Sequence, residues 1–316
     1  MAEVLQKYVG RLAPSPTGAL HLGNVRTFMI AWLRARQQNG KVIMRMEDLD
    51  HPRDKPGAAA QAIEDLKWLG FDWDEEFVQS ERKDVYRAAL GQLQAKGMVY
   101  ACTCTRRDVE AAQSAPHAGE QLFYPGTCRD KHLEWTPKAC WRFKTPKGSH
   151  IIVDDVFAGK YEQTVDEKLG DFPLARDQFG AGYTLAAVVD DALMGVTEIV
   201  RGDDLLPATP AQMLVQHALN LPAPQYCHVP LLVGPDRRRL AKRHGDTRIS
   251  NYRAQGVSPE IVIGGLAYLS GWLDSPRPIA LDELIPVFSL AAVNPRPLII
   301  DNQGTISTLV LKSVRR

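Results

Sequence analysis

The sequence lacks the features that mark membrane-spanning and secreted proteins. Its 316 residues, of which 45% are hydrophobic, contain no apolar run of roughly eighteen residues, the length that a membrane helix needs. The first ten residues carry no apolar signal region. Five cysteines are too few for a disulfide framework in a chain of this length, which favours a reducing compartment. We therefore expect a cytoplasmic protein with a large core and no membrane partner. We also expect a monomer, although these absences do not determine the oligomeric state.

A strong net charge and the common nucleotide-binding signatures are also missing. The formal net charge is only +1, which neither indicates nor excludes nucleic-acid binding, because local basic patches matter more than the sum. No GKS or GKT triplet follows the glycine-rich turn near the N-terminus, and that turn does not read GxGxxG. A P-loop and the usual dinucleotide fingerprint are therefore excluded at this turn. We find no internal repeat, and length alone suggests two domains.

The first fifty residues nevertheless predict a clear supersecondary unit. The pattern predicts a buried strand at 8–13, a turn rich in proline and glycine at 14–18, a helix at 25–39 and a second strand at 41–47. Asn24 is suited to cap the helix, and Gly40 is suited to end it. This order predicts a parallel βαβ unit, whose ligand site lies at the strand ends beside the helix N-terminus.

The turn before this helix is suited to a nucleotide. A helix N-terminus offers N–H groups and a partial positive charge to a phosphate. Gly23 has no Cβ, so a base or phosphate can approach the backbone, and the His21 imidazole stands where it can reach a phosphate oxygen. The alternative is a histidine in a tight turn beside a structural glycine, since short motifs produce false positives.

The remainder of the chain alternates between helical and extended patterns. Helices are predicted at 54–69, 82–96, 210–219 and 258–269, and strands at 98–102, 141–143, 150–153, 185–189, 198–201 and 229–233. The stretch from 103 to about 180 is rich in charges, proline and glycine. We interpret it as an insertion that splits a doubly wound parallel sheet.

Two arginines and one glutamate follow predicted strands. Arg11 and Arg201 lie at strand ends that face the same crevice in a doubly wound sheet, and a guanidinium pairs well with a carboxylate. Glu47 is suited to hold an ammonium group, and Tyr183 to add a hydroxyl. The group would suit an amino acid with two carboxylates, although each residue alone is better explained by a surface ion pair.

Two further clusters have both functional and structural explanations. Residues 237–244 include six basic or potentially basic side chains, which indicates either a phosphate-binding loop or a solvated face. Cys102, Cys104 and Cys128 lie close enough in sequence for a structural zinc site, which needs four ligands. On general grounds the fourth would be His117, His132 or Cys140. Without a metal the cysteines are simple packing residues.

Several motifs together resemble class I aminoacyl-tRNA synthetases, and most closely the glutamyl branch. The first is Arg11-x-Ala13-Pro14-Ser15-Pro16-Thr17-Gly18-x-x-His21-x-Gly23-Asn24. The resemblance continues through residues 45–50, 196–202 and 239–245, in the order of the family and over nearly the whole chain. It implies a Rossmann-type catalytic fold in which a KMSKS-type loop is formed by residues 239–243.

The resemblance also implies roles for individual residues. The glutamate-binding positions are Arg11, Leu12, Ala13, Pro14, Ser15, Glu47, Tyr183 and Arg201. ATP, which arrives with magnesium, would be bound by His21, Gly23, Asn24 and Lys242, and the catalytic residues among these are His21, Gly23 and Lys242. Ala241 replaces the usual serine of the loop. Which arginine binds the side-chain carboxylate of glutamate stays open. The resemblance selects Tyr124 as the fourth zinc ligand beside Cys102, Cys104 and Cys128.

The chain is short for a glutamyl-tRNA synthetase, because only about 70 residues follow Gly245. It therefore resembles the short glutamyl-queuosine tRNA(Asp) synthetases, which activate glutamate without tRNA and attach it to the queuosine base of the anticodon. The alternatives are a shortened enzyme that charges the 3′ end of tRNA(Glu), which the KRHG motif at 242–245 favours, and a silent RNA-binding relative. The expected division of the chain is a first catalytic half at 1–100, a zinc-containing insertion at 101–180, a second catalytic half at 181–245 and a helical stem-contact region at 246–316.

Overall fold

The predicted βαβ unit is present at the start of the chain. In this computed structural model, β1 (Val9–Leu12) and β2 (Lys41–Met46) pair in parallel and are joined by α1 (Leu22–Gln37). A third parallel strand, β3 (Glu75–Val78), pairs with β2. The structure describes residues 7–49, 54–111, 122–176, 181–237, 240 and 247–300.

A second sheet continues from the free edge of the first. Its order is β7 (Gly159–Thr164), β6 (His150–Asp155), β10 (Gln225–Val229) and β9 (Glu198–Gly202). The backbone N–H of Thr197 donates to the carbonyl of Val9 at 2.9 Å, so β9 lies beside β1. The strands β6, β10 and β9 are parallel, but β7 is antiparallel to β6. The predicted Rossmann-type fold is confirmed, while the prediction of a purely parallel sheet is wrong.

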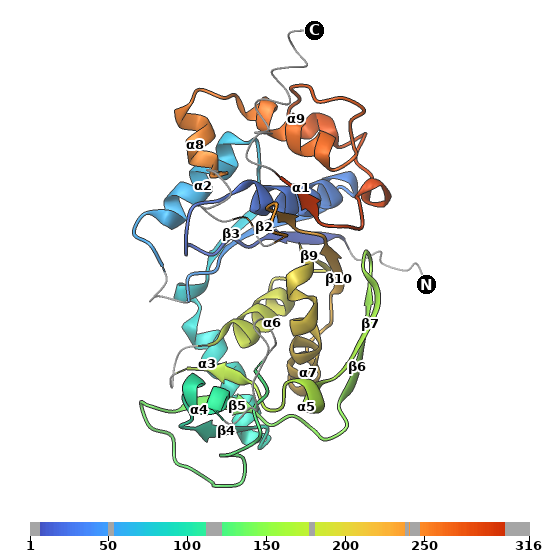
Figure 1. The fold of residues 1–316 in the computed structure, drawn as a ribbon. Helices are drawn as coiled ribbons and strands as arrows, with labels where there is room; N and C mark the ends of the chain where they lie inside the picture. The colour runs from blue at the N-terminus through green and yellow to red at the C-terminus, as the bar shows by residue number, and fades with distance from the viewer. Residues whose placement is uncertain are drawn as a thin grey trace.

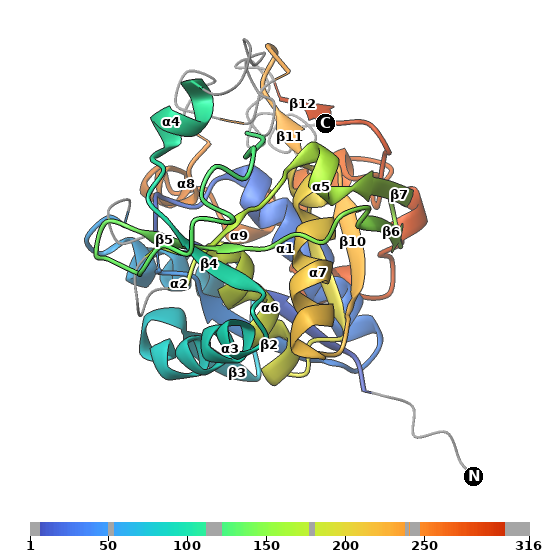
Figure 2. The same ribbon diagram turned by 90° about the horizontal axis from the view of Figure 1, so that it is seen from below.

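Helices cover both faces of these strands. Figure 1 shows α1, α8 (Ile249–Ala254) and α9 (Pro259–Leu269) above the strands, and α6 (Tyr183–Leu193) and α7 (Thr209–Leu219) below them. Figure 2, seen from below, shows α3 (Lys83–Ala95) beside α6 and α7. Within the described ranges, every helix is too short or too polar to pass through a lipid bilayer. The remaining elements are α2 (Ala58–Trp68), α4 (Arg106–Ala111), α5 (Val165–Lys168), η1 (Gln79–Glu81), η2 (Asp203–Ala208), β11 (Leu232–Val233), η4 (Asp282–Leu284), η5 (Leu290–Ala292) and β12 (Leu298–Ile299).

A small antiparallel sheet carries two of the five cysteines, Cys102 and Cys140. It is formed by β4 (Val99–Cys102), β5 (Cys140–Phe143) and β8 (Pro173–Ala175), and it lies at the lower end of the molecule in Figure 1. The segment predicted as an insertion is therefore divided between two sheets. Its strands β4, β5 and β8 form the small sheet, whereas its strands β6 and β7 belong to the sheet of β10 and β9.

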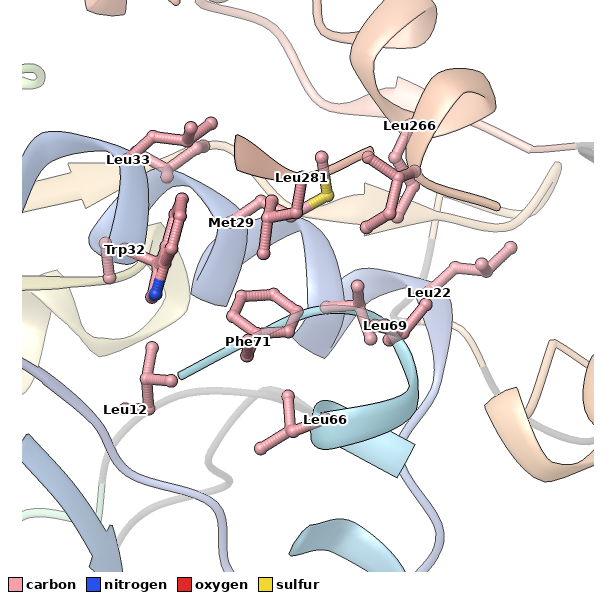
Figure 3. Close-up of a cluster of buried hydrophobic side chains, with 14 of the residues drawn as sticks. Leu12, Leu22, Met29, Trp32, Leu33, Leu66, Leu69, Phe71, Leu266 and Leu281 are labelled. Carbon is pink, nitrogen blue, oxygen red and sulfur yellow. The ribbon is translucent and has the colours of Figure 1, made fainter. Parts of the chain in front are cut away.

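The largest cluster of buried apolar side chains lies above the first sheet and includes the C-terminal segment. Figure 3 shows its centre, with side chains from β1, α1, the end of α2 and α9. Its labelled members are Leu12, Leu22, Met29, Trp32, Leu33, Leu66, Leu69, Phe71, Leu266 and Leu281. Arg253 of α8 adds ion pairs to Asp65 and Glu64 of α2, at 3.0 and 2.8 Å. The helices α8 and α9 are thus built onto the catalytic half, and their proposed contact with a tRNA stem stays a prediction.

Three sequence-based assignments are wrong. The run 185–189 is not a strand but part of α6, because an apolar run that is buried on all sides looks the same in a helix and in a central strand. The expected strand at 229–233 is interrupted at Pro230, so that β10 ends at Val229 and β11 pairs instead with β12. Helix α2 starts at Ala58, after Gly57 adopts a left-handed backbone with φ of 77°.

Helix α1 has different ends from those predicted. It is capped by His21, not by Asn24, and it begins at Leu22. At its other end Asn39 adopts the left-handed conformation, with φ of 49°, and Gly40 N–H donates to the carbonyl of Ala35 at 2.9 Å. Gly40 is still required, because a Cβ at this position would lie 2.6 Å from the Tyr8 carbonyl oxygen.

Candidate active site

A cavity of about 810 Å³ opens where the carboxyl ends of β1, β2 and β9 meet the N-terminus of α1. The predicted site residues that line it are Arg11, Ala13, Pro14, Ser15, His21, Gly23, Asn24, Glu47, Tyr183 and Arg201. Leu12 does not line the cavity, since its side chain is buried in the apolar cluster above the sheet. Lys242, Ala241 and the rest of the predicted loop lie outside the described residues, although Leu240 lines the cavity.

The turn into α1 presents a histidine of defined tautomer. Nδ1 of His21 accepts hydrogen bonds from the backbone N–H groups of Gly23 and Asn24, at 3.1 and 3.4 Å, and Oδ1 of Asn24 accepts from His21 N–H at 3.2 Å. Since Nδ1 accepts, the proton of the neutral ring is on Nε2, which can donate to a phosphate oxygen. A Cβ on Gly23 would lie 3.0 Å from Cε1 of His21, so glycine here makes room for the ring.

The floor of the cavity, at Arg11 and Glu47, rests on a buried network of charges. Nη1 of Arg45 donates to Asp191 at 2.7 Å, and its Nη2 donates to Glu47 at 3.0 Å. Arg11 lies 3.5 Å from the same Asp191 carboxylate through its Nε and donates to the Val200 carbonyl at 2.9 Å. Sequence reasoning gave no role to Arg45 or Asp191. The available signal was a charged residue within each of two apolar segments, because such a residue is rarely buried without a partner.

Burial changes the protonation equilibria of this floor. It lowers the pKa of Arg11, although Asp191 opposes that shift, and it raises the pKa of Glu47 even though Arg45 and Arg11 favour the carboxylate. The anionic form of Glu47 is therefore not fully compensated by the protein alone. A positively charged ligand group beside Glu47 would supply the missing compensation.

Arg201 lines the cavity from β9, the strand beside β1, and its hydrogen-bond partners are neutral. It is 5% exposed, and its Nη2 donates to Thr209 at 2.8 Å and to Gln212 at 2.7 Å. Its Nη1 donates to the hydroxyl of Tyr183 at 3.3 Å, and Tyr183 itself is 41% exposed at the start of α6.

The balance of charge in the cavity follows from these contacts. Three guanidinium groups, those of Arg11, Arg45 and Arg201, are buried with two carboxylates, those of Glu47 and Asp191. Among these five groups the positive charges exceed the negative charges by one, and Arg201 is the guanidinium with no carboxylate in direct contact, because the buried Asp155 reaches it only through His228. A ligand with a net charge of −1 would neutralise the set, and buried charges are stable only when they are paired.

The cysteine cluster is separate from the cavity and has the composition of a metal site. The sulfur atoms of Cys102, Cys104 and Cys128 all lie within 4.8 Å of one another. The Tyr124 hydroxyl lies 3.3 Å from the sulfur of Cys102 and 3.7 Å from that of Cys104. Three thiols and one phenol around a common point fit the tetrahedral, sulfur-rich coordination that zinc prefers.

Neighbouring groups support the anionic form of one of these thiols. A hydrogen bond from Cys140, the partner of Cys102 across β4 and β5, combines with bonds from Tyr124 and Arg142 and lowers the pKa of Cys102 to about 4. The Arg142 Nε lies 3.2 Å from this sulfur. Of the other candidate ligands, His132 is exposed and outside the cluster, and His117 lies outside the described residues.

Comparison with known proteins is consistent with this geometry. Residues 7–291 match the family described as tRNA synthetases class I (E and Q), catalytic domain. A protein of Symbiobacterium thermophilum named Glutamyl-Q tRNA(Asp) synthetase is 48% identical over 92% of this chain and 94% of its own length. A Glutamate--tRNA ligase of Aquifex aeolicus is 40% identical over 95% of this chain but only 65% of its own length.

A solved structure gives the same result for the fold. The crystal structure of a glutamate tRNA ligase from Elizabethkingia meningosepticum, in complex with its amino acid, superposes with a TM-score of 0.80 at 28% identity. The superposition covers 94% of this chain and 68% of that one. On the family match and the identities together, the chain belongs to the class I tRNA synthetases of the E and Q type.

Proposed function

We propose that the protein activates L-glutamate with ATP, without needing tRNA, and transfers the glutamyl group to the queuosine base in the anticodon of tRNA(Asp). The observation that carries the choice of amino acid is Arg201, the buried guanidinium of the cavity that has no carboxylate in direct contact. Glutamate has two carboxylates and one ammonium and therefore a net charge of −1, whereas glutamine has none. Glutamine would leave Arg201 without a carboxylate in direct contact, and a lost hydrogen bond to a charged group costs about 1.5–3 kcal/mol.

The side chains suggest how glutamate is held. Glu47 binds the ammonium group with the carboxylate oxygen that does not accept from Arg45. Arg11 and Arg201 bind the two carboxylates, and the Tyr183 hydroxyl lies beside Arg201 to orient one of them. The turn residues Ala13, Pro14 and Ser15 also line the cavity and complete the proposed glutamate site.

ATP would occupy the side of the cavity at the start of α1. His21, Gly23 and Asn24 lie there, and Nε2–H of His21 donates to a phosphate oxygen. An α-carboxylate oxygen of glutamate attacks the α-phosphorus, the bond to the β-phosphate oxygen breaks, and pyrophosphate leaves with its charge. Lys242 would stabilise the charge that develops on the departing pyrophosphate, and magnesium bound to ATP would share that charge, as in other phosphoryl transfers.

The tRNA acceptor is proposed from the relatives. Four proteins with 41–48% identity carry the name Glutamyl-Q tRNA(Asp) synthetase, and this chain matches 94–99% of their length. The Glutamate--tRNA ligases are less similar and are matched over 61–65% of their length. Transfer requires a hydroxyl of the acceptor to attack the glutamyl carbonyl, with AMP as the leaving group.

We further propose that zinc is held by Cys102, Cys104, Tyr124 and Cys128 and has a structural role. Bound there, zinc would act as a cross-link between β4 and the loop after it. The protein groups themselves make part of that cross-link, because the Tyr124 hydroxyl lies 3.3 Å from the sulfur of Cys102 at the end of β4. The helices α8 and α9 are proposed to approach the tRNA.

The test is glutamate-dependent exchange between ATP and pyrophosphate, measured with and without tRNA. Exchange without tRNA, followed by labelling of queuosine-containing tRNA(Asp), is the expected result. Exchange that requires tRNA, with the label on the terminal adenosine of tRNA(Glu), would identify a tRNA-charging enzyme instead. No exchange with either tRNA would indicate a silent RNA-binding relative and would overturn the proposal.

A further inference from the structure

Behind the cavity wall, Arg201 is held by an imidazole. Its Nε donates to Nε2 of His228 on β10 at 2.9 Å, while its Nη2 is used by Thr209 and Gln212. Three of the five N–H bonds of the guanidinium therefore point into the protein. Nη1, which lies beside Tyr183, is left on the side of the cavity. The acceptors on the inner side are an imidazole, a hydroxyl and an amide, and all three are neutral.

The imidazole is held in turn by a carboxylate from a distant part of the chain. Nδ1 of His228 lies 2.6 Å from Oδ2 of Asp155, and both side chains are fully buried. Asp155 ends β6, the strand that leaves the segment around the cysteine cluster and pairs with β10. It also accepts from the backbone N–H groups of Phe157 and Ala158, at 3.0 and 2.8 Å. The carboxylate is therefore fixed in position independently of the histidine.

These contacts determine the tautomer of the ring. The carboxylate can only accept, so the ring proton is on Nδ1, and Nε2 is the acceptor for Arg201. Burial lowers the pKa of His228 and the nearby Arg201 charge adds to this, outweighing the effect of Asp155. The ring is thus neutral near pH 7, as the hydrogen bond from Arg201 requires. Hydrogen bonds from His228 and the backbone lower the pKa of Asp155 in spite of its burial.

We propose that Asp155 and His228 are positioning residues, which hold Arg201 in the orientation that receives a carboxylate of glutamate without cancelling its charge. This inference rests on the proposed function. A carboxylate in direct contact with Arg201 would also orient it, but it would compete with the substrate for the same guanidinium. The neutral ring of His228 lies between Asp155 and Arg201 and avoids that competition. Asp155 fixes the orientation of the ring, and the ring fixes the orientation of Arg201.

The test compares two amides at position 228. In His228→Asn the short side chain can donate to Asp155 but cannot reach Arg201, whereas the longer side chain of His228→Gln can place an acceptor near Nε of Arg201. We expect His228→Asn to raise the KM for glutamate about tenfold, equivalent to about 1.4 kcal/mol. The KM for ATP should not change, and His228→Gln should restore most of the affinity for glutamate.

A double mutant tests whether the effect passes through Arg201. When Arg201→Ala is already present, His228→Asn should add little to the KM for glutamate, since residues that act through one another are not additive. Cys227→Ala is the matched control. Cys227 is as buried as its neighbour His228, but it belongs to the apolar cluster above the sheet. This variant should lose stability without any change in the KM for glutamate.

The outcomes separate this inference from the proposed function. If the wild type shows glutamate-dependent exchange and folded His228→Asn has the wild-type KM for glutamate, the positioning role is wrong and the proposed function stands. The same conclusion follows if the KM for ATP rises equally. If His228→Asn does not fold, Asp155→Asn replaces it with the same expected result. Calorimetric titration with glutamate gives a second readout, because a wild type that binds no glutamate contradicts the proposed function itself.

Discussion

The cavity and the cysteine cluster are built in opposite ways. The cavity takes its charged groups from β1, β2, α6 and β9, so that Arg45 and Asp191, which are 146 positions apart in sequence, share one hydrogen bond. The cluster takes Cys102, Cys104 and Cys128 from a single short stretch. The cavity therefore exists only when the whole sheet has formed. The cluster takes its sulfur atoms from one stretch, and that stretch is supported by Arg142 and by the hydrogen bond from Tyr124 N–H to the Leu169 carbonyl.

The two regions also differ in how their charges are balanced. In the cavity, guanidinium and carboxylate groups compensate one another across the sheet and leave Arg201 without a carboxylate in direct contact. In the cluster, the donors are thiols and a phenol, and the nearby cation is Arg142, whose guanidinium lies 3.8 Å from the ring centre of Tyr124. Loss of one charge should therefore disturb the cavity as a whole, while changes at the cluster should stay local.

Removing the central charge of the cavity should give the largest effect. In Arg45→Ala, both Asp191 and Glu47 lose a partner inside the protein. We expect the free energy of unfolding to fall by about 3–5 kcal/mol, the usual cost of breaking a buried ion pair. Urea denaturation measures this change. Arg106→Ala, which removes an exposed pair with Glu110, is the control and should cost less than about 1 kcal/mol. Equal losses in the two variants would contradict a cavity built on long-range charge pairing.

The catalytic lysine should affect the rate and not the stability. Lys242→Ala should slow pyrophosphate exchange by about 10²–10³-fold, because one preorganised cation at the transferring phosphate is worth about 3–4 kcal/mol of transition-state stabilisation. The KM for glutamate should change little. Saturation kinetics in glutamate and in ATP separate the two effects. A large rise in the KM for glutamate, with an unchanged rate at saturation, would place Lys242 in the amino-acid site instead.

Arg201→Ala should act on binding of the amino acid. Loss of a charged hydrogen-bond donor to a carboxylate costs about 1.5–3 kcal/mol, so the KM for glutamate should rise by about 10–100-fold. Lys41→Ala is a control at the opposite end of β2, where the lysine pairs with Glu75 at the surface. An unchanged affinity for glutamate in Arg201→Ala would disprove the proposed pocket.

The sequence predicted the charged residues that line the cavity better than the residues that support them from behind. Arg11, Glu47 and Arg201 were expected there because strand ends in a Rossmann-type sheet meet at one edge. Their supporting residues were not, because no local pattern connects Asp155 with His228, which are 73 positions apart. The same limit explains the misassigned run 185–189, whose burial on all sides depends on tertiary packing. The cysteine cluster was recognisable in sequence since its spacing is local.

The smallest effect on activation should come from removing metal at the cluster. A chelator should increase protease cleavage between residues 100 and 130 before ATP binding is affected, because the cluster lies outside the cavity.

We expect one zinc per chain by elemental analysis, lost in Cys104→Ser and kept in Cys227→Ser. Tyr124→Phe and Cys140→Ser then distinguish the fourth ligand, since loss of the ligand should weaken zinc binding more than loss of a group that only hydrogen-bonds to a ligand, which costs about 10–100-fold. Cleavage that is unchanged by chelation would show that residues 100–130 are held by protein contacts alone. The cysteine cluster and the cavity would then differ in how far apart their residues lie in sequence, and not in whether a metal stabilises them.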